Sequence, residues 1–164
     1  MFALRGAAYA TPAERYEALA AQARALLEGE RDLTANAANL ASLVFHTLPD
    51  LNWAGFYWLK GRELVLGPFQ GKPACVRIAM GRGVCGTAAR ERHTILVPDV
   101  NAFPGHIACD SASASEIVVP LVKGGRLLGV LDLDSPKPRR FDETDASGLE
   151  AVVRIFLDAT DFGS

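Results

Sequence analysis

Three cysteines, Cys75, Cys85 and Cys109, all lie between Gly71 and Pro120. Their neighbours are glycine, proline, small polar and apolar residues, so no second metal ligand stands at the short spacing of structural zinc sites. A chain of 164 residues buries about two-thirds of its unfolded surface and needs no disulfide for stability. The cysteines therefore indicate redox chemistry on sulfur.

Two of the cysteines are candidate nucleophiles, for different reasons. Cys85 is predicted to lie in the first turn of a short helix ending near Arg92, where backbone N–H groups lower the pKa of a thiol. The glycines around it match neither the P-loop nor the dinucleotide fingerprint. Cys109 lies in an irregular segment, 98–114, and a loop of that length inside a compact domain is usually functional. Local physical chemistry alone favours Cys85.

Three acidic residues are candidates for a ligand site. Asp132 and Asp134 point to one face at the end of a predicted strand. Carboxylates so close repel each other unless a cation lies between them, which indicates an ammonium or arginine site, although a solvated strand end is the alternative. Glu116, on the partner strand, reaches the same face only if the hairpin contains a bulge, for which Pro120 is a candidate position.

Alternating and helical patterns predict the elements that position these residues. An aromatic strand carries Trp53, Phe56, Tyr57 and Trp58, more large side chains than one buried face needs, so some of them could line a pocket. Thr11, Asp32 and Asp142 are predicted helix caps. Strands are expected at about 51–59, 63–66, 75–80, 94–97, 116–122 and 127–134, and helices at about 11–28, 32–48, 83–92 and 142–156.

Composition narrows the classes of partner. Charged residues make up 22% of the chain and the net charge is −2, so there is no basic stripe for nucleic acid and no polybasic patch for a membrane. No run reaches the roughly 20 apolar residues of a membrane span, and Arg5 interrupts the N-terminal run that an export signal would need. We expect one domain over residues 1–164, small molecules or proteins as partners, and a reducing cytoplasm, where thiols stay free.

A family resemblance runs from about Asn52 to Pro136. It rests on NWAGFYWLKGRELVLGPFQGKPACVRIAMGRGVCGTAA and VPDVNAFPGHIACDSASASEIVVPLVKGGRLLGVLDLDSP, which are similar to free methionine-R-sulfoxide reductases, stand-alone enzymes of the GAF-domain superfamily. The cysteine spacing and the PGHIACD and SEIVVP blocks are its specific features, whereas Ala79 and Met80 depart from the expected proline and aromatic residue. The resemblance implies an α+β, GAF-like fold, a six-stranded antiparallel sheet with helices packed against it.

The resemblance also implies roles for individual residues. It makes Cys109 the nucleophile, Cys75 the main resolving thiol and Cys85 an auxiliary one, against the local preference for Cys85. It implies a Cys sulfenic acid, an intramolecular disulfide, thioredoxin as external reductant and no bound cofactor, and it leaves monomer and homodimer open. The residues that it assigns to the substrate are Glu116, Asp132 and Asp134 for the ammonium group and Trp53 and Tyr57 for the methyl group.

Three other interpretations stay open at this stage. A non-catalytic GAF domain could bind a cyclic nucleotide or a chromophore. A thiol redox sensor could switch a dimer through its three cysteines without turnover. A zinc site could use His106 with the three cysteines, although no pair has the short ligand spacing of structural sites.

Overall fold

The structure is a computed structural model that describes residues 2–4, 9, 11–107 and 110–163. The described helices are α1 (Pro12–Leu27), α2 (Leu33–Thr47), α3 (Gly83–Glu91), α4 (Glu143–Ala159) and a 3-10 turn, η1 (Val100–Ala102). The strands are β1 (Trp53–Lys60), β2 (Glu63–Gly71), β3 (Arg77–Ala79), β4 (Ile95–Val97), β5 (Ser115–Lys123) and β6 (Arg126–Ser135).

Short polar side chains start three of the helices, as the sequence predicts. The Thr11 hydroxyl accepts a hydrogen bond from the backbone N–H of Glu14, and the carboxylates of Asp32 and Asp142 accept from the first turns of α2 and α4. Each such bond satisfies an N–H group that has no partner within the helix. Among the described residues, no helix combines the length and apolarity needed to span a bilayer.

All six strands form one antiparallel sheet in the order β3-β2-β1-β6-β5-β4. Two hairpins, β1-β2 and β5-β6, supply its four central strands, and β1 pairs with β6 to join them. The predicted α+β fold with a six-stranded antiparallel sheet is therefore confirmed.

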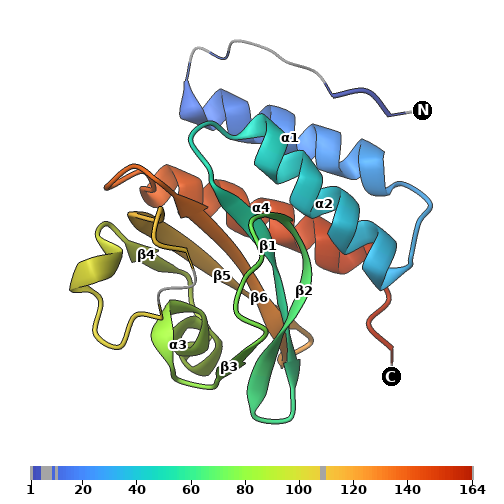
Figure 1. The fold of residues 1–164 in the computed structure, drawn as a ribbon. Coiled ribbons are helices and arrows are strands. Elements are labelled where there is room, and N and C mark those ends of the chain that lie inside the picture. The colour runs from blue at the N-terminus through green and yellow to red at the C-terminus, as the bar shows by residue number, and fades with distance from the viewer. Residues whose placement is uncertain (1, 5–8, 10, 108–109, 164) are drawn as a thin grey trace.

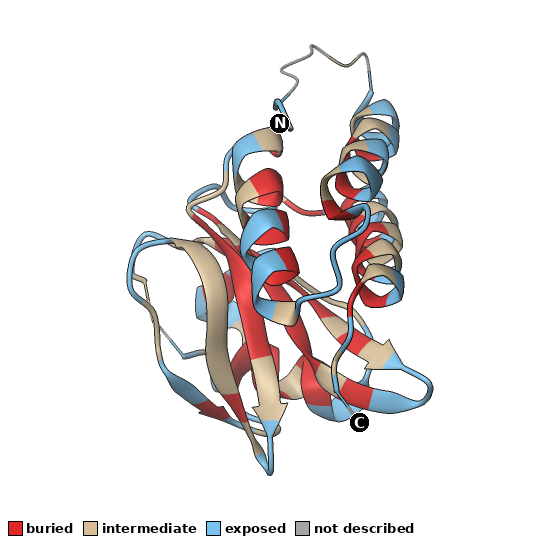
Figure 2. Ribbon diagram, turned by 90° about the vertical axis from the view of Figure 1, so that its right-hand side faces the viewer, coloured by how far each residue is buried: buried red, intermediate tan, exposed pale blue. Residues whose placement is uncertain are grey.

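The helices cover the two faces of the sheet unequally. Figure 1 shows α1, α2 and α4 together on one side of the sheet and α3 on the other. In Figure 2 the buried positions of the helices form stripes that face inward, as expected for amphipathic helices. The sheet is therefore buried on both faces, and the α3 face is the one that contains most of the predicted site.

Alternation along β1 divides its aromatic residues between the two faces. Phe56 packs in the core beneath the three-helix layer, with its ring centroid 4.9 Å from that of Phe156. Trp53 and Tyr57 belong to the second cluster, under α3. Two of the four aromatic residues flagged in the sequence thus line the α3 side, whereas Phe56 and Trp58 belong to the core.

Candidate active site

The register of the central hairpin brings the three predicted acids to one face. Glu116 on β5 lies directly opposite Asp134 on β6, and Asp132 is paired with Val118 on the next position of the same face. The required bulge is present, but it is not at Pro120. The pairing shifts by one residue on β6, where Leu128 is the extra residue, so the prediction of its position was wrong. The bulge lets all three carboxyl groups point toward α3.

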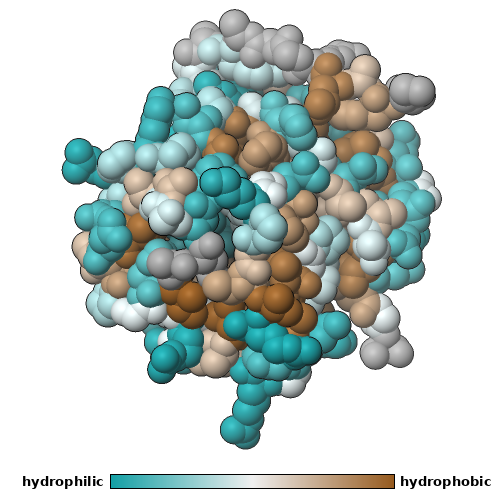
Figure 3. All heavy atoms as spheres, viewed as in Figure 1, coloured by the Kyte–Doolittle hydropathy of each residue, from teal (hydrophilic) through white to brown (hydrophobic). Residues whose placement is uncertain are grey.

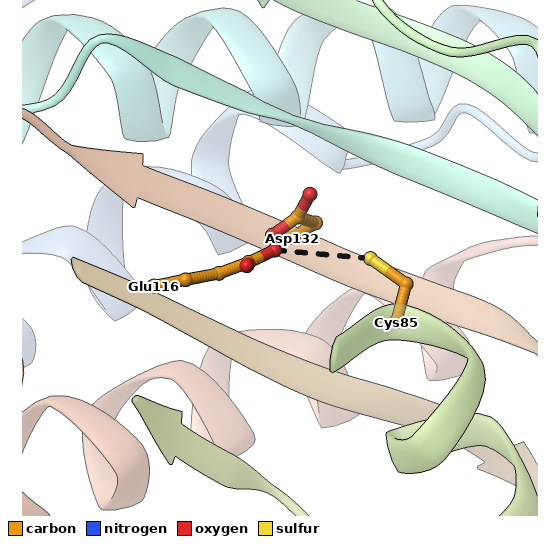
Figure 4. Close-up of side chains that lie close together, drawn as sticks. All are labelled: Cys85, Glu116 and Asp132. Atoms are coloured by element: carbon orange, nitrogen blue, oxygen red, sulfur yellow. Dashed lines mark hydrogen bonds between the residues drawn. The ribbon is translucent and has the colours of Figure 1, made fainter. Parts of the chain in front are cut away.

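Helix α3 directs a thiol at these acids. Figure 4 shows Cys85 pointing from α3 toward Glu116 and Asp132 on the sheet, and its thiol donates a hydrogen bond to Glu116 Oε2 at a sulfur to oxygen distance of 4.0 Å. A side chain on Gly86 would meet the carbonyl of Ala79 at 2.5 Å, so this glycine allows α3 to start close against the end of β3.

At Cys85 the effect of burial on the thiol pKa outweighs the effect of the helix N-terminus. The pKa of this thiol is raised well above its usual value because the side chain is buried, and next because Asp132 and Glu116 lie close to it. The expectation that Cys85 is an activated nucleophile is therefore wrong. Dipole effects at a helix terminus are small compared with the desolvation of a charge beside two acids. Cys85 stays a neutral thiol near pH 7.

Burial also raises the pKa of each acid in the cluster. For Glu116 desolvation is the largest cause, followed by the nearby charges of Asp132 and Asp134. Asp134 follows the same pattern, whereas hydrogen bonds from Glu116 and Cys85 partly offset desolvation at Asp132. Burial and the neighbouring aspartates thus favour the protonated form of Glu116, and the cluster as a whole favours an added positive charge.

These raised pKa values predict that the empty site weakens the fold as the pH rises. An acid whose pKa is higher in the folded state contributes stability below its unfolded pKa, near 4, and this stability is lost as the pH rises toward the folded value. We expect Asp134→Asn to stabilise the ligand-free protein by on the order of 1 kcal/mol at pH 8, which raises the Tm by about 2–4 °C, and by less at pH 5.

Thermal unfolding followed by circular dichroism at both pH values tests this prediction. The control is Asp161→Asn, because Asp161 is exposed and its pKa is lowered by hydrogen bonding to Arg31. That variant should not gain stability. An Asp134→Asn protein that is no more stable than the parent at pH 8 would contradict the account of the buried acids.

Aromatic side chains form the wall beside the acids. The rings of Trp53 and Tyr57 stack with centroids 5.9 Å apart, and the Phe69 ring also stacks with Trp53, at 5.2 Å. The Tyr57 hydroxyl donates to the carbonyl of Cys75 at 2.8 Å, and the indole N–H of Trp53 donates to the carbonyl of Lys72 at 3.1 Å. The wall thus holds the segment that carries Cys75.

The two described cysteines differ in state. Cys75 is half-buried and disulfide-bonded, whereas Cys85 is buried and free. Cys109, the nucleophile implied by the resemblance, lies outside the described residues. A zinc site built from the three cysteines and His106 does not fit this arrangement, because a sulfur in a disulfide is not a thiolate ligand.

Two contributors to the site were not found from the sequence. The Asn52 side-chain amide donates to Asp110 Oδ2 and to Ser113 Oγ, each at 3.1 Å, and so ties the end of the predicted functional loop to the start of β1. His106, considered only as a zinc ligand, has its Nε2 3.9 Å from Glu116 Oε1, and burial lowers its pKa. Neither contact leaves a local sequence signal, because each joins distant parts of the chain.

The acids, Cys85, His106, Trp53 and Tyr57 line one pocket between α3 and the sheet. Figure 3 shows apolar residues gathered on the molecular face over α3 and β3, in the orientation of Figure 1. Every predicted substrate-binding residue lines the pocket, as does Cys85. The described lining comprises Trp53, Tyr57, Lys72, Pro73, Ala74, Ile78, Arg82, Gly83, Val84, Cys85, His106, Ile107, Asp110, Ser113, Glu116, Asp132 and Asp134.

Comparison with known proteins agrees with this geometry. A family model described as "GAF domain" matches residues 34–159. "Protein YtsP" of Bacillus subtilis is 58% identical over 79% of this chain and 81% of its own length, and the "Free methionine-R-sulfoxide reductase" of Escherichia coli is 51% identical over 85% of each. The structure of free methionine-R-sulfoxide reductase from Neisseria meningitidis in complex with its substrate superposes with a TM-score of 0.93 at 45% identity, covering 97% of this chain and 95% of that one. The chain therefore belongs to the GAF-domain family, and within it to the free methionine-R-sulfoxide reductases.

Proposed function

We propose that this protein reduces free L-methionine-(R)-sulfoxide to methionine. The observation that carries the proposal is the buried group of Glu116, Asp132 and Asp134 beside the aromatic wall of Trp53 and Tyr57. Asp132 Oδ1 is buried and has no hydrogen-bond partner among the described residues. A substrate ammonium would supply the missing charge and donors, while the thioether end would pack on the aromatic rings.

The same group explains selectivity for the free amino acid. A methionine sulfoxide inside a peptide has no α-ammonium, so it would leave the acids without a partner at a cost of several kcal/mol. The free α-carboxylate has candidate partners at the start of α3, where the cap residue Arg82 makes no side-chain hydrogen bond to the first turn. Lys72 and Arg82 also line the pocket. Both ends of a free amino acid are thus matched.

Reduction follows from thiol chemistry. The Cys109 thiolate attacks the sulfoxide sulfur as Glu116 gives its proton to the oxygen, so methionine leaves and Cys109 becomes a sulfenic acid. The thiol of Cys75 then displaces that oxygen as water, and a disulfide forms. The disulfide-bonded state of Cys75 beside a free Cys85 supports this assignment of the resolving thiol over the alternative, Cys85.

A thioredoxin-type dithiol is the proposed reductant, with no bound cofactor, in a reducing compartment such as the cytoplasm. Thiol exchange requires the partner to approach the disulfide closely. Val76, next to Cys75, is 60% exposed, and Ile107 is 37% exposed. Large apolar side chains at such positions suit a transient protein contact around the disulfide.

Coupled oxidation of NADPH through thioredoxin reductase and thioredoxin tests the function. We expect turnover with free L-methionine-(R)-sulfoxide and at least about 100-fold lower kcat/KM with a peptide-bound sulfoxide, which corresponds to about 2.7 kcal/mol. The S epimer is the control for stereochemistry. Absence of turnover on the free R form, in the presence of a disulfide that thioredoxin reduces, would support a redox sensor instead and refute the proposal.

A further inference from the structure

We propose that Cys85, Glu116 and Asp132 form a binding site for a thiophilic divalent cation such as Zn²⁺, which would block the pocket. Only the expected consequence, inhibition of the enzyme, rests on the proposed function. The site itself follows from where three elements place their side chains. Cys85 comes from α3, Glu116 from β5 and Asp132 from β6 (Figure 4).

The geometry is close to that of a metal site. One ligand atom from each residue, a sulfur and two carboxylate oxygens, lies within 4.8 Å of the others, and all three residues are buried. Zinc binds sulfur at about 2.3 Å and carboxylate oxygen at about 2.0–2.2 Å. Zinc binding would therefore require the three side chains to adjust toward a common centre.

A second observation points to a ligand at this position. Asp132 is 6% exposed, and its Oδ1 lacks a hydrogen-bond partner among the described residues although it lines the pocket. A buried carboxylate oxygen without a donor is costly, and a cation can relieve that cost. The pocket, which His106 also lines, provides an entry path for the cation.

The donor set selects the class of metal. A thiolate with two carboxylates suits a borderline cation such as Zn²⁺, whereas Mg²⁺ and Ca²⁺ prefer oxygen ligands alone. On binding, the Cys85 thiol proton would leave to solvent as the sulfur to metal bond forms. Because the cation would occupy the acids assigned to the substrate ammonium, cation and substrate would exclude each other.

Cobalt(II) is a suitable probe, because a thiolate ligand gives it a charge-transfer band in the near ultraviolet. The experiment uses the disulfide-bonded protein, in which a free-thiol titration of the unfolded chain should find Cys85 alone. We expect one cobalt ion per chain, with a charge-transfer band that Zn²⁺ displaces. Cys85→Ser should abolish the band and weaken Zn²⁺ binding. Loss of a residue that only hydrogen-bonds to a metal ligand lowers metal affinity roughly 10–100-fold, and loss of the ligand itself should lower it by more.

Two comparisons complete the test. Asp132→Asn should weaken Zn²⁺ binding, whereas Glu63→Gln, which changes a partly exposed acid on β2 paired with Arg77, should not. Free methionine sulfoxide should raise the apparent Kd of Zn²⁺ in proportion to its concentration. A charge-transfer band that persists in folded Cys85→Ser, or equal Zn²⁺ affinity of the parent and Asp132→Asn, would overturn the site. Turnover is not measured in this experiment. If no metal site is found, the proposed function is still tested independently by the reductase assay.

Discussion

We expect replacement of Cys109 with serine to abolish the reduction of free methionine-R-sulfoxide, and replacement of Cys75 with serine to leave one burst of methionine followed by arrest. In the proposed mechanism the first variant lacks the thiolate that attacks sulfur, and the expected loss exceeds about 10³-fold in kcat. The second variant would still form a sulfenic acid but would lack the proposed resolving thiol. Rapid-quench measurement of methionine, without reductant and then with thioredoxin, separates the two outcomes.

Cys85→Ser is the matched control for these variants. Its thiol is buried and its pKa is raised by burial and by the neighbouring acids, so it is a poor nucleophile near pH 7. We expect this variant to keep the burst and most of its steady-state rate with thioredoxin. If Cys85→Ser is inactive while Cys75→Ser turns over normally, the assigned roles of the two thiols are reversed.

Glu116→Gln lowers kcat by about 10²–10³-fold, in the range expected for loss of a general acid. Glu116 is 6% exposed, and burial with two neighbouring aspartates raises its pKa well above the usual range. The raised pKa favours the protonated form of Glu116, and glutamine has no such proton to donate to the leaving oxygen. The kcat of the parent enzyme should fall as the pH rises through this raised pKa, and that dependence should vanish in the variant.

Two further variants show whether Glu116 itself is the donor. His106→Gln removes the imidazole 3.9 Å from Glu116, and Asp132→Asn removes a proposed partner of the substrate ammonium. We expect His106→Gln to retain most of kcat and Asp132→Asn to raise KM more than it lowers kcat. The role of Glu116 is refuted by a large kcat loss in His106→Gln combined with a near-normal kcat in Glu116→Gln.

Local patterns in the sequence were sufficient for most of the fold. Helix caps at Thr11, Asp32 and Asp142 act through side chains only two or three residues from the groups they bind, so their signals are local. The alternation of side chains along the predicted strands identified both central hairpins and placed Asp132 and Asp134 on one face of the sheet. The resemblance to the reductases supplied the arrangement of the strands in one antiparallel sheet and the predicted substrate-binding residues, all of which line the pocket.

Other features depend on contacts that no local pattern contains. The sequence indicated that a bulge was needed but not that Leu128 would form it, because either strand of a hairpin can absorb an extra residue. The raised pKa of Cys85 comes first from burial and then from acids 47 and 31 residues away along the chain, neither of which a helix-terminus argument includes. Asn52 reaches Asp110 across 58 positions, which only the folded chain reveals.

The hydrogen bond from the Tyr57 hydroxyl to the Cys75 carbonyl links the aromatic wall of the pocket to the segment that carries Cys75. The ring of Tyr57 belongs to the wall that the substrate would press against, and its hydroxyl holds the backbone of the segment that becomes oxidised. Displacement of the ring by an occupant is therefore passed to the sulfur-bearing segment. By thermodynamic reciprocity, making or breaking the disulfide must then change the affinity for whatever fills the pocket, so that oxidation could itself promote release of the methionine just formed.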